Sequence, residues 1–347
     1  MQFYKKDKDR LVCLLCSYYC KLKENQIGIC GVNKNTGDKI ECLVYGHISA
    51  LNIDPIEKKP LYHFLPKSRS LSLGTVGCNF KCSFCQNHGI SQEKNIDKSK
   101  YHSPIDVVNM ALKYKCESIS YTYNEPTIFY PYAKDIAIEA KKHGIKSVYV
   151  SNGFESSEVI DDMKGLIDAV NIDLKCFSQS YYKSNLGGNL NQVLQNLKHF
   201  KKNDIWLEIT TLLVPGKNDS KDELEKIAKF IKEELDEFTP WHISSFHPDY
   251  KDMHIPHTSI DSLQMAYKIG KEAGLKYVYI GNTSLQNDTH CPNCNHTVLK
   301  RNRFEVIENN IKNGKCPKCN YKIQGAYPKM IPIRKTGLAD SVYPDNT

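Results

Sequence analysis

The chain has 347 residues, of which 40% are hydrophobic and 25% are charged, with a formal net charge of +8 and 14 cysteines. This length allows one large domain with small appendages, no stretch approaches the roughly 20 apolar residues of a membrane span, and the N-terminus has no apolar run that would predict a signal peptide. Many cysteines without a secretory signal favour metal binding in a reducing compartment, so we expect a cytoplasmic protein, and the positive charge suits an anionic partner such as RNA or an acidic protein.

The first group of cysteines lies in the N-terminal segment, about residues 1–65. It has a C-x2-C-x3-C-x9-C pattern formed by Cys13, Cys16, Cys20 and Cys30, and Cys42 follows further on. A polar segment rich in turn-forming residues cannot build a core of its own, so we expect a bound metal to hold it together. Four thiolates would complete a zinc site or a fully ligated iron–sulfur cluster; the spacing does not separate the two, and zinc is our first choice. The alternative is that only the first two cysteines function as a pair and the others pack.

The middle of the chain, about residues 66–282, alternates strand and helix patterns. Short runs rich in β-branched and aromatic residues predict strands at 71–75, 118–123, 147–150, 169–175, 206–214, 241–246 and 276–280. Helical patterns lie between them, at about 104–115, up to 143–144, and at about 156–165, 190–202, 220–236 and 260–273. This alternation predicts right-handed βαβ units and a parallel sheet.

A second group of cysteines follows the first of these strands. Cys78, Cys82 and Cys85 form a C-x3-C-x2-C pattern with Phe84 just before the last cysteine. Three thiolates can hold three irons of a 4Fe–4S cluster and leave the fourth iron without a protein ligand, whereas electron-transfer clusters commonly use four cysteines. An open iron is a position for chemistry, like the open position of a catalytic zinc. The alternatives are three packed thiols or half of a zinc site.

The third group of cysteines lies at about residues 283–330. Two C-x2-C turns, 21 residues apart, contain Cys291, Cys294, Cys316 and Cys319. Paired turns of this kind are typical of a zinc ribbon, because each turn directs two sulfurs at one ion. A rubredoxin-like iron, a disulfide pair or a further iron–sulfur cluster are the alternatives. We expect His290 to be exposed and not a ligand, and residues 331–347 to form a loose tail.

The cysteine loop with Phe84 resembles the signature of the radical S-adenosylmethionine (SAM) superfamily. The resemblance implies that the methionine moiety of SAM binds the open iron, and that an electron from the cluster cleaves SAM to a 5′-deoxyadenosyl radical. It also implies an α/β fold, a partial (β/α)6 TIM-like barrel whose site lies at the C-terminal ends of the strands. The Cys-rich N-terminal segment and the zinc-ribbon-like module would flank this barrel. A reductant such as flavodoxin or ferredoxin would supply the electron.

The same resemblance implies contacts to SAM from the first strands. The backbone at Phe84 is expected to touch the adenine. The second strand is followed by Tyr123-Asn124-Glu125-Pro126, where the family usually has Gly-Gly-Glu-Pro around the SAM amino group. The loss of two glycines restricts the backbone, but Asn124 and Glu125 can still accept hydrogen bonds from an ammonium group. The alternative for Glu125 is a charge at the N-terminus of a helix.

Polar residues also end the following strands. Ser151 and Asn152 follow the third strand, and alternation along the fourth strand places Asp173 and Lys175 on one face. A buried lysine beside a carboxylate is costly unless both are paired. Binding of Lys175 to the SAM carboxylate and of Asp173 to a ribose hydroxyl would satisfy both groups, as similar residues do in activating enzymes for glycyl radical enzymes; the alternative is an internal ion pair. His247, after the sixth strand, is a candidate ribose contact.

A closer resemblance extends over nearly the whole chain. Residues 54–66, the cysteine loop, residues 121–127 and the N-terminal cysteines resemble the AmmeMemoRadiSam-system radical SAM enzyme family, which is related to pyruvate formate-lyase activating enzymes. We therefore expect an enzyme that cleaves SAM reductively and abstracts hydrogen from an unidentified substrate. The alternatives are a glycyl radical enzyme activase, an RNA-modifying enzyme, and a non-catalytic iron–sulfur and zinc protein that binds a partner. The set Glu125, Asp173 and Lys175 argues against the last of these.

Overall fold

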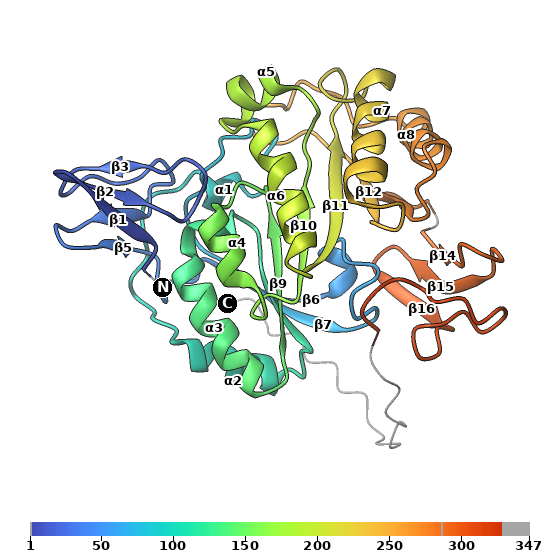
Figure 1. Cartoon of the computed structure of the whole chain (residues 1–347), viewed down its shortest axis with the longest axis horizontal. Coiled ribbons are helices and arrows are strands. Elements are labelled where there is room, and N and C mark those ends of the chain that lie inside the picture. Colours follow the sequence, from blue (N-terminus) through green and yellow to red (C-terminus); the bar gives the residue numbers. More distant parts are fainter. Residues whose placement is uncertain (1, 286, 328–347) are drawn as a thin grey trace.

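An eight-stranded sheet forms the centre of the computed structural model, which describes residues 2–285 and 287–327 (Figure 1). The strands lie in the order β13-β12-β11-β10-β9-β8-β7-β6, with β6 antiparallel to β7 and all other neighbours parallel. Their bounds are β6 (Ala50–Pro55), β7 (Arg69–Gly74), β8 (Ser118–Tyr121), β9 (Lys146–Ser151), β10 (Ala169–Asp173), β11 (Trp206–Leu213), β12 (Trp241–Ser245) and β13 (Val278–Gly281). Because β6 and β13 are the two edges, the sheet is an open, partial barrel.

Helices connect the parallel strands and cover the outside of the sheet (Figure 1). The longer helices are α2 (Pro104–Lys113), α3 (Tyr130–Lys142), α4 (Ser157–Met163), α6 (Leu190–Lys202), α7 (Lys221–Phe230) and α8 (Ile260–Glu272). Five of them begin at a serine or asparagine whose side chain accepts a backbone N–H of the first turn, which stabilises a helix start. Within the described residues, no helix is both long and apolar enough to cross a membrane.

The predicted alternation of strands and helices is confirmed, and the sheet contains one strand more than the pattern predicted. β6 lies in the N-terminal segment, runs antiparallel to β7 and is largely exposed or half-buried along its length. A short strand of this kind at the edge of a sheet has neither the continuous apolar run nor the strict alternation that makes a strand visible in a sequence. The expected tail at 331–347 lies outside the described residues.

The N-terminal cysteines lie in a small lobe of short strands beside the barrel, shown in blue in Figure 1. One three-stranded sheet contains β1 (Tyr4–Asp7), β2 (Arg10–Cys13) and β3 (Lys21–Leu22), and a hairpin contains β4 (Asn33–Asn35) and β5 (Ile40–Cys42). Buried side chains of the lobe, such as Leu15 and Val32, belong to the same hydrophobic cluster as the barrel core. The lobe therefore shares its core with the barrel.

The segment between β6 and β7 closes the N-terminal end of the barrel. The backbone N–H groups of Tyr62 and His63 donate to the buried carboxylate of Glu208 on β11, at 2.9 and 2.8 Å, and His242 Nε2 lies 2.7 Å from the same carboxylate. Arg301 fixes the C-terminal strands against this segment, since its Nη2 donates to the Tyr62 carbonyl at 2.9 Å. These strands are β14 (Thr289–His290), β15 (Thr297–Asn302) and β16 (Glu305–Asn309). The closed end leaves the opposite edge of the sheet for a site.

Candidate functional site

The three cysteines of the predicted cluster lie on the loop after β7, at the C-terminal edge of the sheet. Cys78, Cys82 and Cys85 are all free thiols. The backbone N–H of Phe80 donates to the Cys78 sulfur at 3.4 Å, and the Ser91 hydroxyl lies 3.2 Å from the Cys85 sulfur. Hydrogen-bond donors near the sulfurs stabilise thiolates, and they tune the potential of a bound cluster. The donor set therefore fits an iron–sulfur cluster.

Asn124, at the end of the second parallel strand, holds this loop in place. Its Oδ1 accepts the backbone N–H of Thr75 at 3.1 Å, and its Nδ2 donates to the carbonyl of Gly77 at 2.8 Å. The preceding residue, Tyr123, has φ +73°, the left-handed region that favours glycine. The backbone thus adopts a conformation suited to the family's glycine without a glycine, and the Tyr123 hydroxyl is anchored by donating to Asp54 at 3.0 Å.

Glu125 connects the second and third parallel strands below the loop. Its buried carboxylate accepts hydrogen bonds from the Ser151 hydroxyl at 2.9 Å and from the Asn152 backbone at 2.7 Å. It also accepts the Thr127 N–H at 3.1 Å, so the helix-terminus alternative describes part of its role. Asn152 in turn donates from Nδ2 to Asn79, which lies between two of the loop cysteines, at 2.8 Å. The structure therefore brings Glu125, Ser151, Asn152 and the cysteine loop together.

Glu155 is a buried residue of this network that the sequence did not single out. The Ser151 hydroxyl lies 2.5 Å from Glu155 Oε1 and 2.9 Å from Glu125 Oε1. One hydroxyl has a single proton to donate, so one of the two carboxyls must itself be protonated for both contacts to be hydrogen bonds. Burial, together with the neighbouring Glu155, raises the pKa of Glu125 to about 8, and burial raises the pKa of Glu155 to about 7. In the sequence, the one indication that Glu155 belongs to the site is its position, three residues after Asn152 at the end of the third parallel strand.

The fourth parallel strand brings a charged pair to the same loop. Lys175 Nζ forms an ion pair with Asp173 Oδ2 at 2.8 Å, and Nζ lies 5.8 Å from the ring centre of Phe84. β10 ends at Asp173, so Lys175 belongs to the following loop and not to the strand as predicted. Burial alone would lower the pKa of Lys175, but Asp173 and the nearby Cys82 outweigh it and raise the pKa above its ordinary value. The predicted residues Phe84, Asp173 and Lys175 thus meet beside a cluster cysteine.

His247 lies at the rim of this region. Its Nδ1 lies 3.2 Å from Nε2 of Gln86, the residue that directly follows Cys85. His247 itself is exposed. The segment that follows it packs against the cysteine loop, because the Ser83 hydroxyl donates to Asp252 at 2.6 Å and the backbone N–H of Lys251 donates to the Ser83 carbonyl at 3.0 Å. Sequence patterns gave no signal for these contacts, since they join residues about 170 positions apart.

The four N-terminal cysteines gather on the side of the loop that faces the lobe. Cys13, Cys16 and Cys30 are buried, and Cys20 is half-buried. Burial raises the pKa of Cys13 to about 12, and the neighbouring thiols of Cys30 and Cys20 act in the same direction. Cys30 lines a cavity of about 430 Å³ together with Cys78 of the cluster loop. The N-terminal cysteines and the cluster loop are therefore direct neighbours.

The C-terminal cysteines converge on one point. Cys291 Sγ lies 3.6 Å from Cys319 Sγ, Cys294 Sγ lies 3.7 Å from Cys316 Sγ, and all four sulfurs lie within 4.8 Å of one another. Four thiolates about 2.3 Å from a tetrahedral ion are about 3.8 Å apart. The arrangement therefore fits a single tetrahedral metal, and the four are free cysteines without the disulfide that was the alternative. His290 is exposed, as predicted.

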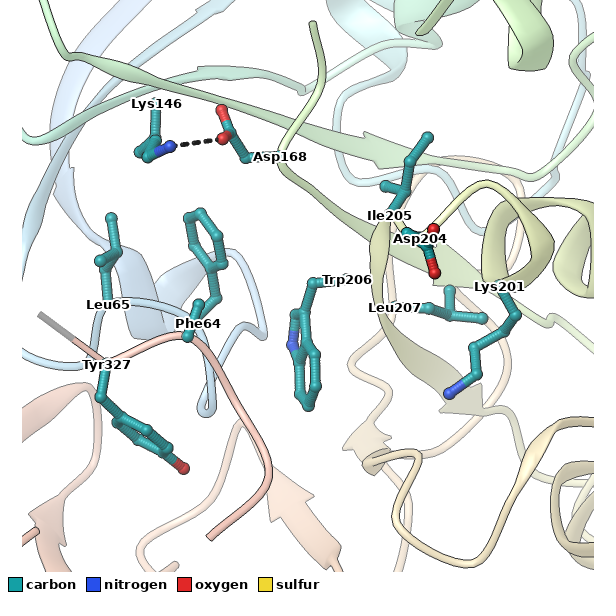
Figure 2. A pocket seen from close by; sticks show the side chains of 11 residues that line it. Phe64, Leu65, Lys146, Asp168, Lys201, Asp204, Ile205, Trp206, Leu207 and Tyr327 are labelled. Carbon is teal, nitrogen blue, oxygen red and sulfur yellow. Dashed lines mark hydrogen bonds and ion pairs between the residues drawn. The ribbon is translucent and has the colours of Figure 1, made fainter. Parts of the chain in front are cut away.

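A cavity of about 640 Å³ lies at the other end of the barrel (Figure 2). Figure 2 shows Trp206, Phe64 and Tyr327 around it, with the ion pair of Lys146 and Asp168 at 2.7 Å on one side. Trp206 and Lys146 are the first residues of β11 and β9, so this cavity is at the N-terminal ends of the strands. Barrel enzymes carry their sites at the opposite ends, where the cysteine loop lies. The cysteine loop therefore lies at the end of the barrel where such enzymes have their sites.

Comparisons with known proteins identify the class of protein. The family model of the Radical SAM superfamily matches residues 72–231. The protein MJ0808 of Methanocaldococcus jannaschii, which is named as uncharacterized, is 40% identical over 328 residues, or 92% of this chain and 97% of that protein. The chain belongs to the radical SAM superfamily. It is a radical SAM enzyme, and this membership implies a 4Fe–4S cluster and SAM as cofactors.

More distant relatives share the central region. The pyruvate formate-lyase 1-activating enzyme of Escherichia coli is 22% identical over 178 residues, which cover 48% of this chain and 71% of that enzyme. Among solved structures, a radical SAM methyltransferase from Sphaerobacter thermophilus has a TM-score of 0.49 and 14% sequence identity, and the match covers 63% of this chain and 68% of that chain. The predicted relation to activating enzymes is confirmed at the level of the family.

Proposed function

We propose that Cys78, Cys82 and Cys85 hold three irons of the 4Fe–4S cluster and that SAM binds across the adjacent strand ends. The observation that carries this proposal is the meeting of Phe84 and the Asp173–Lys175 ion pair beside the cysteine loop. When bound, the cluster supplies the electron that cleaves SAM into methionine and a 5′-deoxyadenosyl radical. The radical would abstract hydrogen from a substrate that the chain does not identify.

Some side chains around the loop are proposed to contact SAM, and others hold the loop and Glu125 in position. Lys175 has three N–H donors and uses one on Asp173, so two are left for the SAM carboxylate. Asp173 is a third exposed and can accept from a ribose hydroxyl. Glu125 is proposed to meet the SAM amino group and His247 the ribose, with the Phe84 backbone against the adenine. Further contacts are proposed for the side chains of Asn124, Ser151 and Asn152, which in the structure hold Glu125 and the loop in position.

The flanking regions complete the proposal. We divide the chain into a Cys-rich segment at 1–65, the barrel at 66–282, a zinc-ribbon-like module at 283–330 and a tail at 331–347. Zinc is proposed for Cys291, Cys294, Cys316 and Cys319, since their tetrahedral spacing suits it. A flavodoxin or ferredoxin is proposed as the reductant, in the cytoplasm.

Activation of a glycyl radical enzyme is a second candidate, with a protein backbone as the substrate. It is favoured by the match to the pyruvate formate-lyase 1-activating enzyme. Modification of RNA rests on the net charge of +8 and on the zinc-ribbon-like module. The source of the hydrogen atom that the 5′-deoxyadenosyl radical abstracts distinguishes these candidates. Extract from deuterium-grown cells, separated into protein and RNA, should give deuterated 5′-deoxyadenosine only with the fraction that contains the substrate.

The assignment of the cluster cysteines is tested by Cys82→Ala. The anaerobically purified variant, reduced with dithionite in the presence of SAM, should release no 5′-deoxyadenosine, because the cluster lacks one of its three protein ligands. Cys116→Ala is the matched control, since Cys116 is a buried free thiol just before β8 and away from the loop. Cleavage of SAM by Cys82→Ala at the rate of the control would refute the assignment.

A further inference from the structure

We propose that Cys13, Cys16, Cys20 and Cys30 bind a second iron–sulfur cluster of the 4Fe–4S type, directly behind the catalytic loop. Local turns bring the four cysteines together. Cys13 N donates to the Cys20 carbonyl at 2.9 Å, which closes the first turn. The sulfurs of Cys20 and Cys30 both lie within 3.8 Å of one point, the position that a Cβ of Gly28 would take. Gly28 thus leaves room between two thiols from different turns.

The spacing of the thiols favours a cluster over a single ion. In the ribbon, four sulfurs lie within 4.8 Å of one another, as a tetrahedral zinc requires. Elsewhere in residues 2–285 and 287–327, no three cysteine, histidine or carboxylate side chains have ligand atoms this close. The four N-terminal cysteines therefore do not form a close group of this kind. The three cysteines of the catalytic loop likewise form no such close group. Each thiolate of a 4Fe–4S cluster binds a different iron, so its sulfurs lie further apart than those around one ion.

Two buried side-chain amides, of Asn33 and Asn79, lie near the N-terminal cysteines. Asn33 Nδ2 lies 3.4 Å from the Cys30 sulfur, in donating range, and also donates to the Ile128 carbonyl at 2.7 Å. The Nδ2 of Asn79 is buried and makes no hydrogen bond to any described atom. Asn79 directly follows Cys78 and lines the same cavity as Cys30, so this amide lies where the two groups of cysteines meet. A cluster with thiolate and sulfide sulfurs would give the free Asn79 donor an acceptor.

The loop that would bind the second cluster is in direct contact with the loop that would bind the catalytic cluster. Gly77, directly before Cys78, has φ +88°, and a Cβ there would lie 2.7 Å from the Cys30 carbonyl oxygen. The two loops are thus in backbone contact, and Cys30 and Cys78 line one cavity. Four cysteine ligands leave no iron open for SAM, so this cluster would serve electron transfer. Its one-electron donor would be a low-potential flavin or iron–sulfur protein. The electron-transfer role rests on the proposed function; the presence of the cluster does not.

Metal and sulfide counts on the full chain test the proposal without an activity assay. Protein purified and reconstituted under anaerobic conditions should contain about eight irons and eight sulfides per chain, with one zinc. About four irons with two zincs would overturn the proposal, because the N-terminal cysteines would then hold zinc. This count needs no variant, so it does not depend on whether a variant folds.

Two variants assign the clusters. Cys20→Ala, which changes the most exposed of the four cysteines, should lose about half of the iron, and the remaining reduced cluster should still change its electron paramagnetic resonance spectrum when SAM is added. Cys42→Ala is the matched control from the same lobe and should keep all of the iron; loss of iron there would overturn the ligand set. Cys82→Ala should keep one cluster, and the electron paramagnetic resonance spectrum of that cluster should not change when SAM is added. A SAM-responsive cluster in Cys82→Ala would refute the proposed function and leave the second cluster standing.

Discussion

Replacement of Lys175 by alanine tests the SAM site most directly. Lys175 is a cation paired with Asp173 beside the cysteine loop, and its side chain is only 13% exposed. Two of its three ammonium N–H donors are free for the SAM carboxylate. A charge-assisted hydrogen bond of this kind is worth roughly 1.5–3 kcal/mol. Its loss should raise the dissociation constant of SAM about 10- to 100-fold.

The measurement combines equilibrium dialysis of SAM under anaerobic conditions with the iron content and with thermal unfolding in the absence of SAM. The iron content should stay at the wild-type value, because Lys175 is not a ligand of the cluster. Asp173→Asn should weaken binding less, since an amide can still accept a hydrogen bond from a ribose hydroxyl.

A matched control comes from a second ion pair of the same length. Lys134 lies 2.8 Å from Asp162, with side-chain exposures of 18% and 13%, and both lie outside the site. Lys134→Ala should lower the melting temperature and leave SAM binding unchanged. The unpaired Asp173 is 34% exposed and can be hydrated, so Lys175→Ala should lower the melting temperature less than Lys134→Ala. Unchanged SAM affinity with a large loss of melting temperature would make Lys175 a purely internal partner of Asp173.

Two further predictions concern the C-terminal cysteines and the buried carboxyl groups. Cys294→Ser should remove one metal ion per chain and lower the melting temperature, with the iron of the catalytic cluster unchanged; retention of all the zinc, measured by mass spectrometry, would contradict a four-cysteine site. The raised pKa values of Glu125, about 8, and Glu155, about 7, mean that the folded protein without SAM binds more protons than the unfolded chain above about pH 4.5. Its free energy of unfolding should therefore fall as the pH rises towards 8, and Glu155→Gln should flatten this fall while the exposed control Glu225→Gln should not. Denaturant titrations across this pH range measure it, and equal slopes for wild type and Glu155→Gln would argue against the shared proton.

Local chemistry made part of this site visible in the sequence. The cysteine loop, with Phe84 before its last cysteine, and the paired C-x2-C turns are short motifs whose spacing suits metal binding. The alternation of strands and helices was equally readable, because apolar periodicity follows from which face of each element is buried. Asp173 and Lys175 were found by the same means, and their ion pair is present although β10 ends at Asp173.

Only the tertiary structure decided which distant parts of the chain contact these motifs. The contact of the N-terminal lobe with the cluster loop, through Cys30 and Gly77, joins backbones that no local pattern relates. The proton shared by Glu125 and Glu155 through Ser151 depends on which side chains the strand ends bring within hydrogen-bond distance. The sequence determined which thiols and charged groups this protein offers, since those depend on residue types at short spacing. The positions of the thiols in the N-terminal group, and so the difference between one ion and a cluster, depend on distances between separate turns, which only packing fixes.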